Sequence, residues 1–474
     1  MIYDRIFERE KGGSVIMAEN FTQDRKMERL LEEQRKYRDN LVLCRSAAEI
    51  LQRKLQLIEN THKEEGFRTI YKTDRIKSEN SYLDKVSKRL DEGNDLSYED
   101  SHDIVGFRYI FLTEDDAITF VNYIKNYANI THSIKILEEK DYIHNPKESG
   151  YRSYHIIVEV PVETMLGVTN IKAEIQVRTI LMDVFAREEH KLNYKGDCSD
   201  ESKDLLLDLN AVLRKKETEF KNILSSDEEL VKSKDRVKQL PEEESIECTE
   251  EFEKVSYLYN SARSILMGKL NSLLSEYPDS DDIVYKQERI KPVSSIHRKL
   301  KNKGLETTAE NIKTKVGDVV GFKIVCSNEK EVRKLVEYFK SSDSLTIRCE
   351  KDYLTKRKDT GYRGYHIKVE EQIPGKNGNV PIISEIQFRT MLMDAWASFD
   401  DIVYGEKKSE TKKKALADLS SSLRLLSLSL ESIKEFESKN QKEEKTNYVK
   451  ELEEYKNQKT LKLVPVKEEK KEDE

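Results

Sequence analysis

The feature that most constrains the fold is a set of motifs that occurs twice along the chain, in the same order. Four motifs return at spacings between 211 (361 − 150) and 215 (318 − 103) residues: GYRSYH at 150–155 as GYRGYH at 361–366, EIQVRTILMD at 174–183 as EIQFRTMLMD at 385–394, RIK at 75–77 as RIK at 289–291, and DIVGF at 103–107 as DVVGF at 318–322. Small differences in spacing are what surface-loop insertions produce, and the period is far too long for a solenoid repeat. The sequence therefore predicts one domain that has been duplicated.

Length and composition agree with two globular domains. The chain has 474 residues, more than one hydrophobic core usually serves, with 37% hydrophobic and 36% charged residues. A formal charge of −7 argues against a general nucleic-acid coat, and no stretch approaches the ~20 apolar residues that a membrane span requires. The five cysteines form no CxxC pair and the N-terminus lacks a signal-peptide pattern, so we expect free thiols in a cytoplasmic protein.

Hydrophobic periodicity places helices and strands in each copy and predicts an α/β fold. Segments 118–128 and 331–340 have the spacing of amphipathic helices, whereas 103–111, 154–160 and 173–179 have that of strands. We expect each copy to be a mixed β-sheet flanked by helices. The predicted organisation is a flexible N-terminus at 1–23 with an alternative start at Met17, a first domain at 24–231, a charged linker at 232–253, a second domain at 254–440 and a charged disordered tail at 441–474.

The segment AEIQVRT carries the strongest chemical signal. Because side chains alternate along a strand, Glu174, Gln176 and Arg178 share one face. The second copy repeats all three side-chain types, as Glu385, Gln387 and Arg389. A carboxylate beside an amide and a guanidinium suits a site that holds a metal or deprotonates a hydroxyl while it grips phosphate. The alternative is a half-exposed strand with a cross-strand ion pair, and the intact return of the triplet favours the functional interpretation.

A second carboxylate stands at the start of an otherwise buried strand. Asp103 precedes Gly106, which allows close backbone approach. Magnesium takes oxygen ligands and usually binds one or two carboxylates together with substrate phosphates, which Asp103 and Glu174 could provide. An N-cap or turn role is the alternative for Asp103. His102 and Asp103 suggest a His-Asp metal hydrolase, but the second copy has Gly317 in place of the histidine, which we therefore interpret as incidental.

Two further motifs supply aromatic and basic groups. GYRSYH places Tyr151 and His155 on one face of the entering strand, where the tyrosine can stack on a base or belong to the core. RIKSENSYLDK brings Arg75, Lys77 and Lys85 to a helix start, where they suit a triphosphate or form a solvated basic face. The sequence has no GxxxxGK[ST] motif, which excludes a P-loop enzyme, and it has neither GxSxG nor HExxH.

In this order the motifs resemble those of the RelA/SpoT family of nucleotide synthetases, over residues 45–225 and again over 258–435. The resemblance rests on R-x-K-x3-S, D-I-x-G-x-R, D-Y-I…GYRS-x-H, EIQ-x-RT and E-H…Y-K, the last as Glu189-His190 with Tyr194-Lys195. It is nearest to the small stand-alone synthetases, because no separate hydrolase or regulatory region is visible. It implies Mg²⁺-dependent transfer of the β,γ-diphosphate of ATP to the 3′-hydroxyl of GDP or GTP, which makes the stringent-response alarmones ppGpp and pppGpp.

The resemblance also implies roles for residues of the first copy. Asp103 would hold Mg²⁺, and Glu174 would share the metal or act as general base on the 3′-hydroxyl. Arg75 and Arg108 would sandwich the adenine, a task that suits planar guanidinium groups. The remaining residues would bind nucleotide: Lys77 and Lys85 the ATP phosphates, Tyr151 the guanine by stacking, Asp183 the guanine N1–H and 2-amino group, and His155 and Gln176 the ribose and phosphates of the acceptor.

The second copy keeps most of these residues and changes a few. The retained residues are Arg289, Lys291, Asp318, Tyr362, His366, Glu385 and Asp394. Lys323 replaces Arg108 and cannot stack as a flat plane, and Asp400-Asp401 replaces Glu189-His190. The lysine of the last motif is lost if one residue is dropped before Tyr404-Gly405. We therefore expect the first copy to be catalytic and the second to be weaker, differently specific or regulatory.

Two other functions are compatible with the sequence. Some relatives of this family are toxins that diphosphorylate tRNA 3′ ends or make adenosine alarmones. The acidic balance gives no obvious tRNA surface, although the lysines at 412–414 could act locally. A non-catalytic module that senses guanine nucleotides is the second alternative, and the acid pair retained in both copies argues against it. The expected partners are ATP and GDP or GTP, and by analogy a homo-oligomer or an internal pseudo-dimer of the two copies.

Overall fold

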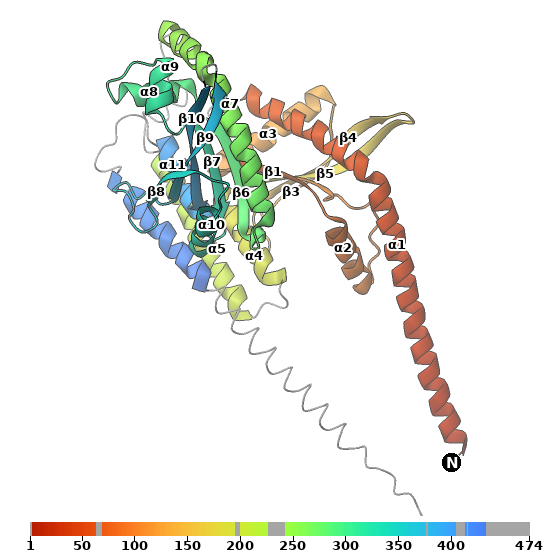
Figure 1. The fold of residues 1–474 in the computed structure, drawn as a ribbon. Coiled ribbons are helices and arrows are strands. Elements are labelled where there is room, and N and C mark those ends of the chain that lie inside the picture. The colour runs from red at the N-terminus through yellow and green to blue at the C-terminus, as the bar shows by residue number, and fades with distance from the viewer. Residues whose placement is uncertain are drawn as a thin grey trace, which may run out of the picture.

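The computed structural model describes residues 2–62, 69–194, 200–225, 242–375, 378–403, 413–414 and 416–432. Within these ranges the chain forms two five-stranded sheets with helices packed on them (Figure 1). None of the helices in these ranges is long and apolar enough to cross a membrane. The duplicated α/β fold that the motifs predict is confirmed.

The sheet of the first copy has the strand order β1-β2-β5-β4-β3. Its strands are β1 (Thr69–Ile76), β2 (Val105–Phe111), β3 (Lys135–Asp141), β4 (Tyr154–Thr164) and β5 (Gly167–Thr179). The central pair, β2 and β5, is parallel, and the other three pairs are antiparallel. The sheet is therefore mixed, and its two central strands are the ones that carry the DIVGF and EIQ motifs.

The second copy repeats this topology strand by strand, in the order β6-β7-β10-β9-β8. Its strands are β6 (Ile283–Ile290), β7 (Val320–Cys326), β8 (Ile347–Asp352), β9 (Tyr365–Gly375) and β10 (Gly378–Thr390). Here too the central pair, β7 and β10, is parallel. Each pair of repeated motifs thus occupies the same place in its own sheet.

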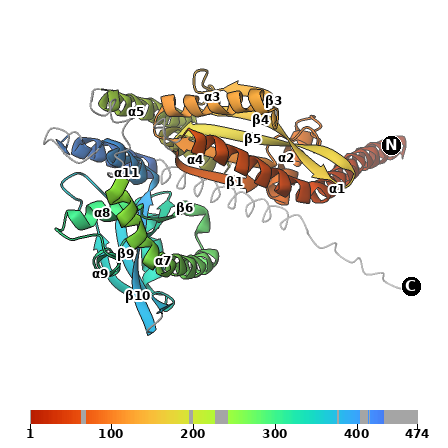
Figure 2. The same cartoon turned by 90° about the horizontal axis from the view of Figure 1, so that it is seen from above.

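Helices connect and cover the strands in both copies. The first copy has α1 (Ile2–Thr61), α2 (Glu79–Asp91), α3 (Glu114–Thr131), α4 (Ile180–Tyr194) and α5 (Asp200–Ser225). The second has α7 (Glu242–Glu276), the short 3-10 helix η2 (Ser280–Asp282), α8 (Val293–Lys301), α9 (Ala309–Lys315), α10 (Glu329–Lys340), α11 (Met391–Val403) and a helix over 416–432. The helix α1 crosses the first sheet, and α7 crosses the second in the same way (Figures 1 and 2).

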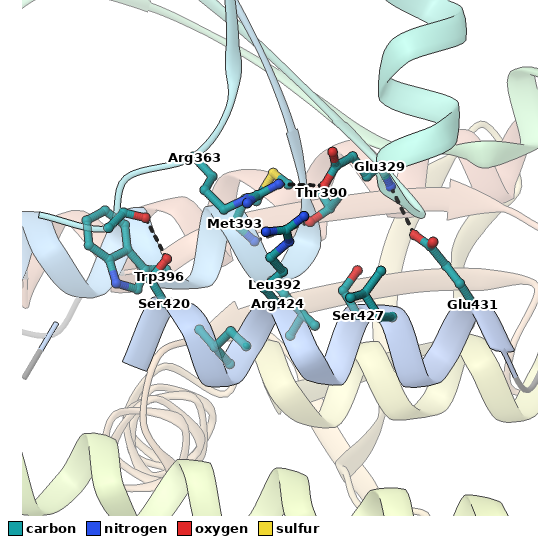
Figure 3. A pocket seen from close by; sticks show the side chains of 13 residues that line it. Glu329, Arg363, Thr390, Leu392, Met393, Trp396, Ser420, Arg424, Ser427 and Glu431 are labelled. Atoms are coloured by element: carbon teal, nitrogen blue, oxygen red, sulfur yellow. Dashed lines mark hydrogen bonds and ion pairs between the residues drawn. The ribbon is translucent and has the colours of Figure 1, made fainter. Parts of the chain in front are cut away.

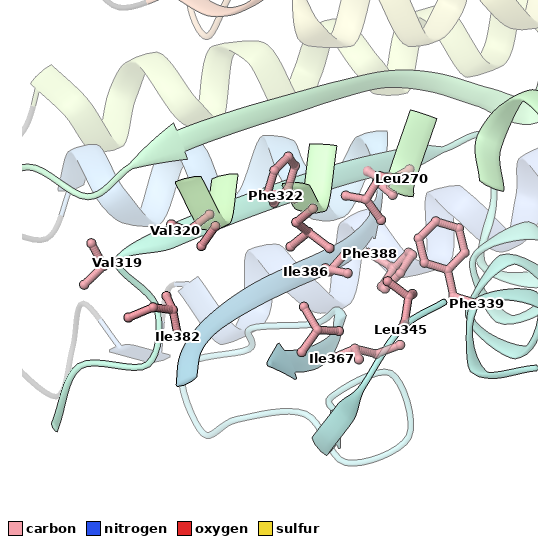
Figure 4. Packing of buried hydrophobic residues seen from close by; sticks show 14 of the residues in the cluster. Leu270, Val319, Val320, Phe322, Phe339, Leu345, Ile367, Ile382, Ile386 and Phe388 are labelled. Atoms are coloured by element: carbon pink, nitrogen blue, oxygen red, sulfur yellow. The ribbon is translucent and has the colours of Figure 1, made fainter. Parts of the chain in front are cut away.

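The core of each copy lies between one face of its sheet and the long helix that precedes it. In α1 the buried side chains Tyr37, Cys44, Ala47, Leu51 and Leu55 recur at helical spacing and pack against the sheet. In the second copy the corresponding layer contains residues from β7, β9, β10, α7 and α10, among them Phe322, Ile367, Ile386, Phe388, Leu270 and Phe339 (Figure 4). Burial of each such aliphatic or aromatic side chain contributes about 1.5–3 kcal/mol.

Parts of the predicted organisation differ from the structure or lie outside it. Residues 2–23, expected to be flexible, are helical and belong to α1. Residues 242–253, expected to be the end of a charged linker, form the first turns of α7, because a glutamate-rich segment can be helical when its polar face meets water. The linker before residue 242 and the tail at 441–474 lie outside the described residues.

The two copies contact each other through equivalent elements. The helix α4 packs against α11, and one apolar cluster contains residues of both copies (Figure 2). Tyr71 of β1 stacks on Tyr285 of β6, with ring centroids 3.9 Å apart and an angle of 14° between the planes. These two tyrosines are equivalent positions of the repeat, 214 residues apart (285 − 71). A residue that meets its own equivalent lies on a two-fold axis, so the copies are related by an approximate two-fold rotation.

In the first copy a buried ion pair fixes α5 to the sheet. Glu217 of α5 is 7% exposed and accepts a hydrogen bond of 2.8 Å from the guanidinium of Arg152, which lies just before β4. The Thr179 hydroxyl at the end of β5 also donates to this carboxylate. Burial, together with the nearby carboxylate of Glu114, raises the pKa of Glu217 to about 7.

This raised pKa predicts a pH-dependent stability. Because the folded-state pKa is about 7 and the ordinary value is 4.5, the contribution is fully present below pH 4.5 and is lost as the pH rises through 7. We expect the free energy of unfolding to fall by up to about 3 kcal/mol across this range, and the Glu217→Gln variant to lose most of that slope. Urea denaturation at several pH values checks this, with Glu219→Gln as the control on the same helix. Identical pH slopes for wild type and Glu217→Gln would contradict it.

Candidate active site

The register of the first sheet brings the predicted polar residues into adjacent positions. Side chains of β2 and β5 alternate, so those that do not enter the core point to the opposite face. On that face Gly106 lies between Arg75 and Glu174, and Gln176 lies between Arg108 and His155. The Arg75 side chain runs across Gly106. Five of the predicted site residues are therefore gathered by strand pairing alone, namely Arg75, Arg108, His155, Glu174 and Gln176.

Glu174 is the carboxylate at the centre of this face. It accepts hydrogen bonds from His155 Nδ1 at 3.0 Å and from Gln176 Nε2 at 2.8 Å. Burial alone would raise the pKa of Glu174, but these hydrogen bonds outweigh burial and hold its pKa below the ordinary value. Glu174 is therefore ionised near neutral pH, and both of its oxygens are oriented by neighbouring side chains.

His155 connects Glu174 to a tyrosine. Burial lowers the pKa of His155, so the imidazole is neutral near pH 7. With Nδ1 donating to Glu174, Nε2 accepts a hydrogen bond of 2.9 Å from the Tyr151 hydroxyl. The Tyr151 ring is half-exposed, and it lies edge-on to Tyr142 and to His155. The structure thus leaves part of the Tyr151 ring accessible while its hydroxyl is engaged.

Asp103 lies at the amino end of β2, close to Glu174. Its two carboxylate oxygens each form a 2.9 Å ion pair, one with Lys77 and one with Lys85. Burial would raise the pKa of Asp103, but the two lysines lower it to about 2. The negative charge of Asp103 also acts to raise the pKa of Glu174, which places the two carboxylates in one electrostatic environment. The predicted grouping of Asp103 with Lys77, Lys85 and Glu174 is what the structure shows.

Arg178 and Asp183 have different surroundings from those expected. Arg178, expected to grip phosphate, is 4% exposed and donates to four acceptors inside the protein: Ser153, Asp183, Tyr151 and Gln176. Asp183, expected to bind guanine, is completely buried. Its carboxylate is taken up by Arg108, Arg178 and Arg187 and by the Tyr71 hydroxyl. Both residues therefore support the site from below, and neither faces a ligand.

The second copy repeats the network with weaker charge compensation. Glu385 is joined to His366, Tyr362 and Gln387 as in the first copy, and Asp318 forms ion pairs of 2.8 Å with Lys291 and 2.7 Å with Lys299. Asp394 is again completely buried, and it accepts from Arg389, from the Tyr285 hydroxyl and from Lys323. Arg289 runs across Gly321 just as Arg75 runs across Gly106.

Some residues of the network carry no motif in the sequence. Tyr71 and Arg187 both contact Asp183, and Lys299 contacts Asp318. The return of Tyr71 as Tyr285 was a usable signal, whereas Arg187 has Ser398 as its equivalent and could not be found by repetition. His190 lies within the electrostatic range of Arg75 and Arg108. Lys195, residues 404–405 and Lys412 lie outside the described residues.

Comparison with known proteins identifies the family. A model of the region found in RelA / SpoT proteins matches residues 74–199 and 288–409. The GTP pyrophosphokinase YwaC of Bacillus subtilis is 40% identical over 122 residues, which cover 26% of this chain and 56% of that protein. The GTP pyrophosphokinase YjbM of the same organism is 33% identical over 166 residues, which cover 33% of this chain and 72% of that protein.

Two solved structures from Bacillus subtilis show a similar extent of match. Small alarmone synthetase 1, bound to its product pppGpp, is 26% identical with a TM-score of 0.36 and covers 39% of this chain and 97% of its own. Small alarmone synthetase 2 is 30% identical with a TM-score of 0.36 and covers 40% of this chain and 99% of its own. The fold and the site define a duplicated α/β domain with a polar sheet face. The chain belongs to the RelA/SpoT family and contains its characteristic region twice.

The network around Asp183 predicts unequal costs for equivalent substitutions. Asp183 compensates three guanidinium groups, whereas Asp394 compensates Arg389 and Lys323 only. Removing one member of a buried ion pair costs about 3–5 kcal/mol. We expect Asp183→Asn to lower the free energy of unfolding by about this amount and Asp394→Asn by less, measured by urea denaturation. Asp115→Asn, which breaks an exposed pair with Lys221, serves as the control and should cost under about 1 kcal/mol. A larger loss for Asp394→Asn would refute this order.

Proposed function

We propose that the chain is a (p)ppGpp synthetase, which transfers the β,γ-diphosphate of ATP to the 3′-hydroxyl of GDP or GTP. The observation that carries this proposal is the pairing of Asp103 and Glu174 beside Arg75, Lys77 and Lys85 on one sheet face. It is supported by family membership and by relatives that are named GTP pyrophosphokinases. We place the activity in the cytoplasm, where its nucleotide substrates are found.

The donor set of this face fits a magnesium ion. Mg²⁺ usually takes one or two carboxylates, keeps several waters and bridges substrate phosphates, and Asp103 and Glu174 are the carboxylates that would hold it. When bound, the metal neutralises phosphate charge during transfer. Lys77 and Lys85, which pair with Asp103 in the structure, are placed to turn to the phosphates of ATP.

The residues around the metal ligands orient and activate the substrates. Glu174, ionised and held by His155 and Gln176, is positioned to accept the proton of the 3′-hydroxyl. Arg75 and Arg108 project from neighbouring strands on the same face and would bind the adenine between their planar groups. The exposed part of the Tyr151 ring would stack on guanine. Because diphosphate transfer needs little covalent help from the protein, positioning and charge neutralisation supply most of the rate.

The first copy is the proposed catalytic one. Arg108 in the first copy is Lys323 in the second, where the ammonium group is buried and paired with Asp394. A lysine has no flat face for a base, so the second copy lacks half of the adenine clamp. The second copy keeps its acid pair, Asp318 and Glu385, and we propose a weaker, differently specific or regulatory role for it.

Transfer of label from ATP tests the proposal. Full-length protein is given γ-labelled ATP and Mg²⁺ with GDP, GTP or tRNA offered separately. We expect labelled ppGpp or pppGpp, reduced at least ~100-fold in Glu174→Gln and largely retained in Glu385→Gln. Glu163→Gln, on the exposed end of β4, is the control. Label on tRNA would instead indicate a toxin-type relative, and nucleotide binding without turnover would indicate a sensing module. Equal losses in the two active-site variants would overturn the ranking of the copies.

A reciprocal exchange tests the adenine clamp. Arg108→Lys gives the first copy the residue of the second, and we expect kcat/KM for ATP to fall about 10-fold as the stacking face is lost. Lys323→Arg in a Glu174→Gln background should raise any residual activity of the second copy. Steady-state kinetics with varied ATP separates the effect on KM from that on kcat. An unchanged kcat/KM in Arg108→Lys would exclude this role for Arg108.

A further inference from the structure

The last helix of each copy occupies the same position on its domain, with a fixed register. The buried leucines Leu206, Leu209 and Leu213 of α5 correspond to Leu416, Leu419 and Leu423, at a constant spacing of 210 residues (416 − 206). Asn210 and Ser420, also 210 residues apart, lie against the equivalent loop glycines, Gly150 and Gly361. The same spacing makes Ser427 the equivalent of Glu217 (427 − 217).

The partners of Glu217 are retained in the second copy although the glutamate is not. Arg152 and Thr179, which hold the Glu217 carboxylate, are equivalent to Arg363 and Thr390, each 211 residues further on. Thr179 Oγ1 accepts from the Met182 N–H, and Thr390 Oγ1 accepts from the equivalent Met393 N–H, so both hydroxyls are oriented alike. In the first copy the hydroxyl hydrogen is donated to Glu217.

A pocket lies at this place in the second copy. Its lining includes Arg363, Thr390, Trp396, Arg424 and Ser427, between α11, the loop before β9 and the helix over 416–432 (Figure 3). The lining also includes Glu329, which accepts from Arg363 Nη2 at 2.7 Å, and Glu431, which accepts from the backbone N–H of Glu329.

Arg363 is a buried cation with part of its bonding capacity unused. Its residue is 6% exposed, and among the residues that the structure describes none accepts a hydrogen bond from Nε. Burial lowers the pKa of Arg363, and the nearby Arg424 adds to that effect. In the first copy the equivalent guanidinium is bound by two carboxylates, Glu114 and Glu217. In the second copy Glu329 supplies one, and Ser427 stands where the other would be.

We propose that the second copy binds a small carboxylate in this pocket, at the place that the Glu217 side chain fills in the first copy. Arg363 and the hydroxyls of Thr390 and Ser427 would donate to the carboxylate, as Arg152 and Thr179 donate to Glu217. Leu392 and Met393 form an apolar wall beside these donors, which suits a short aliphatic chain. The ligand class is therefore a short-chain monocarboxylate.

Thermal unfolding of the full-length protein with propionate tests this site. At constant pH and ionic strength, with chloride as the matched salt, we expect propionate to raise the melting temperature saturably by about 2–4 °C. Ser427→Glu attaches a carboxylate at the site, so it should raise the melting temperature without propionate and abolish the response. Ser429→Glu adds the same charge on the exposed side of the helix and should keep the response.

The reciprocal variant and a second anion complete the test. Glu217→Ser opens the equivalent place in the first copy, so its lowered melting temperature should be partly restored by propionate. A wild-type response that persists unchanged in Ser427→Glu would show an adventitious effect and overturn the proposal. No wild-type response, with rescue of Glu217→Ser, would show that the second-copy pocket is not a carboxylate site. A larger shift with inorganic phosphate than with propionate would overturn the assignment to carboxylates.

Discussion

Arg178 and Asp183 form an ion pair five residues apart, at the point where β5 ends and α4 begins, and both side chains are almost completely buried. A buried charge is tolerated only when its hydrogen bonds are satisfied, so every neighbour of this pair is constrained in turn. Arg178 orients Tyr151 and Gln176, which orient His155 and Glu174. The geometry of the candidate site therefore follows from a pair that has no contact with substrate.

The same pair also reaches the other copy. The Asp183 carboxylate accepts from the Tyr71 hydroxyl, and the Tyr71 ring stacks on Tyr285, whose hydroxyl is bound by Asp394. Asp394 pairs with Arg389, which leads to Tyr362, His366 and Glu385. An unbroken series of hydrogen bonds, ion pairs and one ring stack thus joins Glu174 to Glu385 through the interface.

The sequence allowed the strands and the polar face to be predicted, but not what lies beneath that face. Repetition and strand alternation correctly placed Glu174, Gln176 and Arg178 on one side of β5, because both are local properties of the chain. Burial of Arg178 depends on Asp183 and on the loop that carries Tyr151, which only tertiary packing brings to it. Asp183 was assigned to guanine for the same reason: its position after the strand is visible in the sequence, but the direction of its side chain is not. The pocket beside Arg363 likewise becomes visible only when the two copies are compared in space.

Joining the two copies in one chain has a consequence for how each half can change. In a dimer of identical subunits every substitution appears on both sides of the two-fold axis, whereas here Arg187 faces no second arginine, because its equivalent is Ser398. The covalent connection also makes the encounter of the halves intramolecular, so their pairing does not weaken on dilution. A tolerant half and a constrained half can therefore persist together at a fixed one-to-one ratio, which two separately expressed proteins could maintain only through matched synthesis.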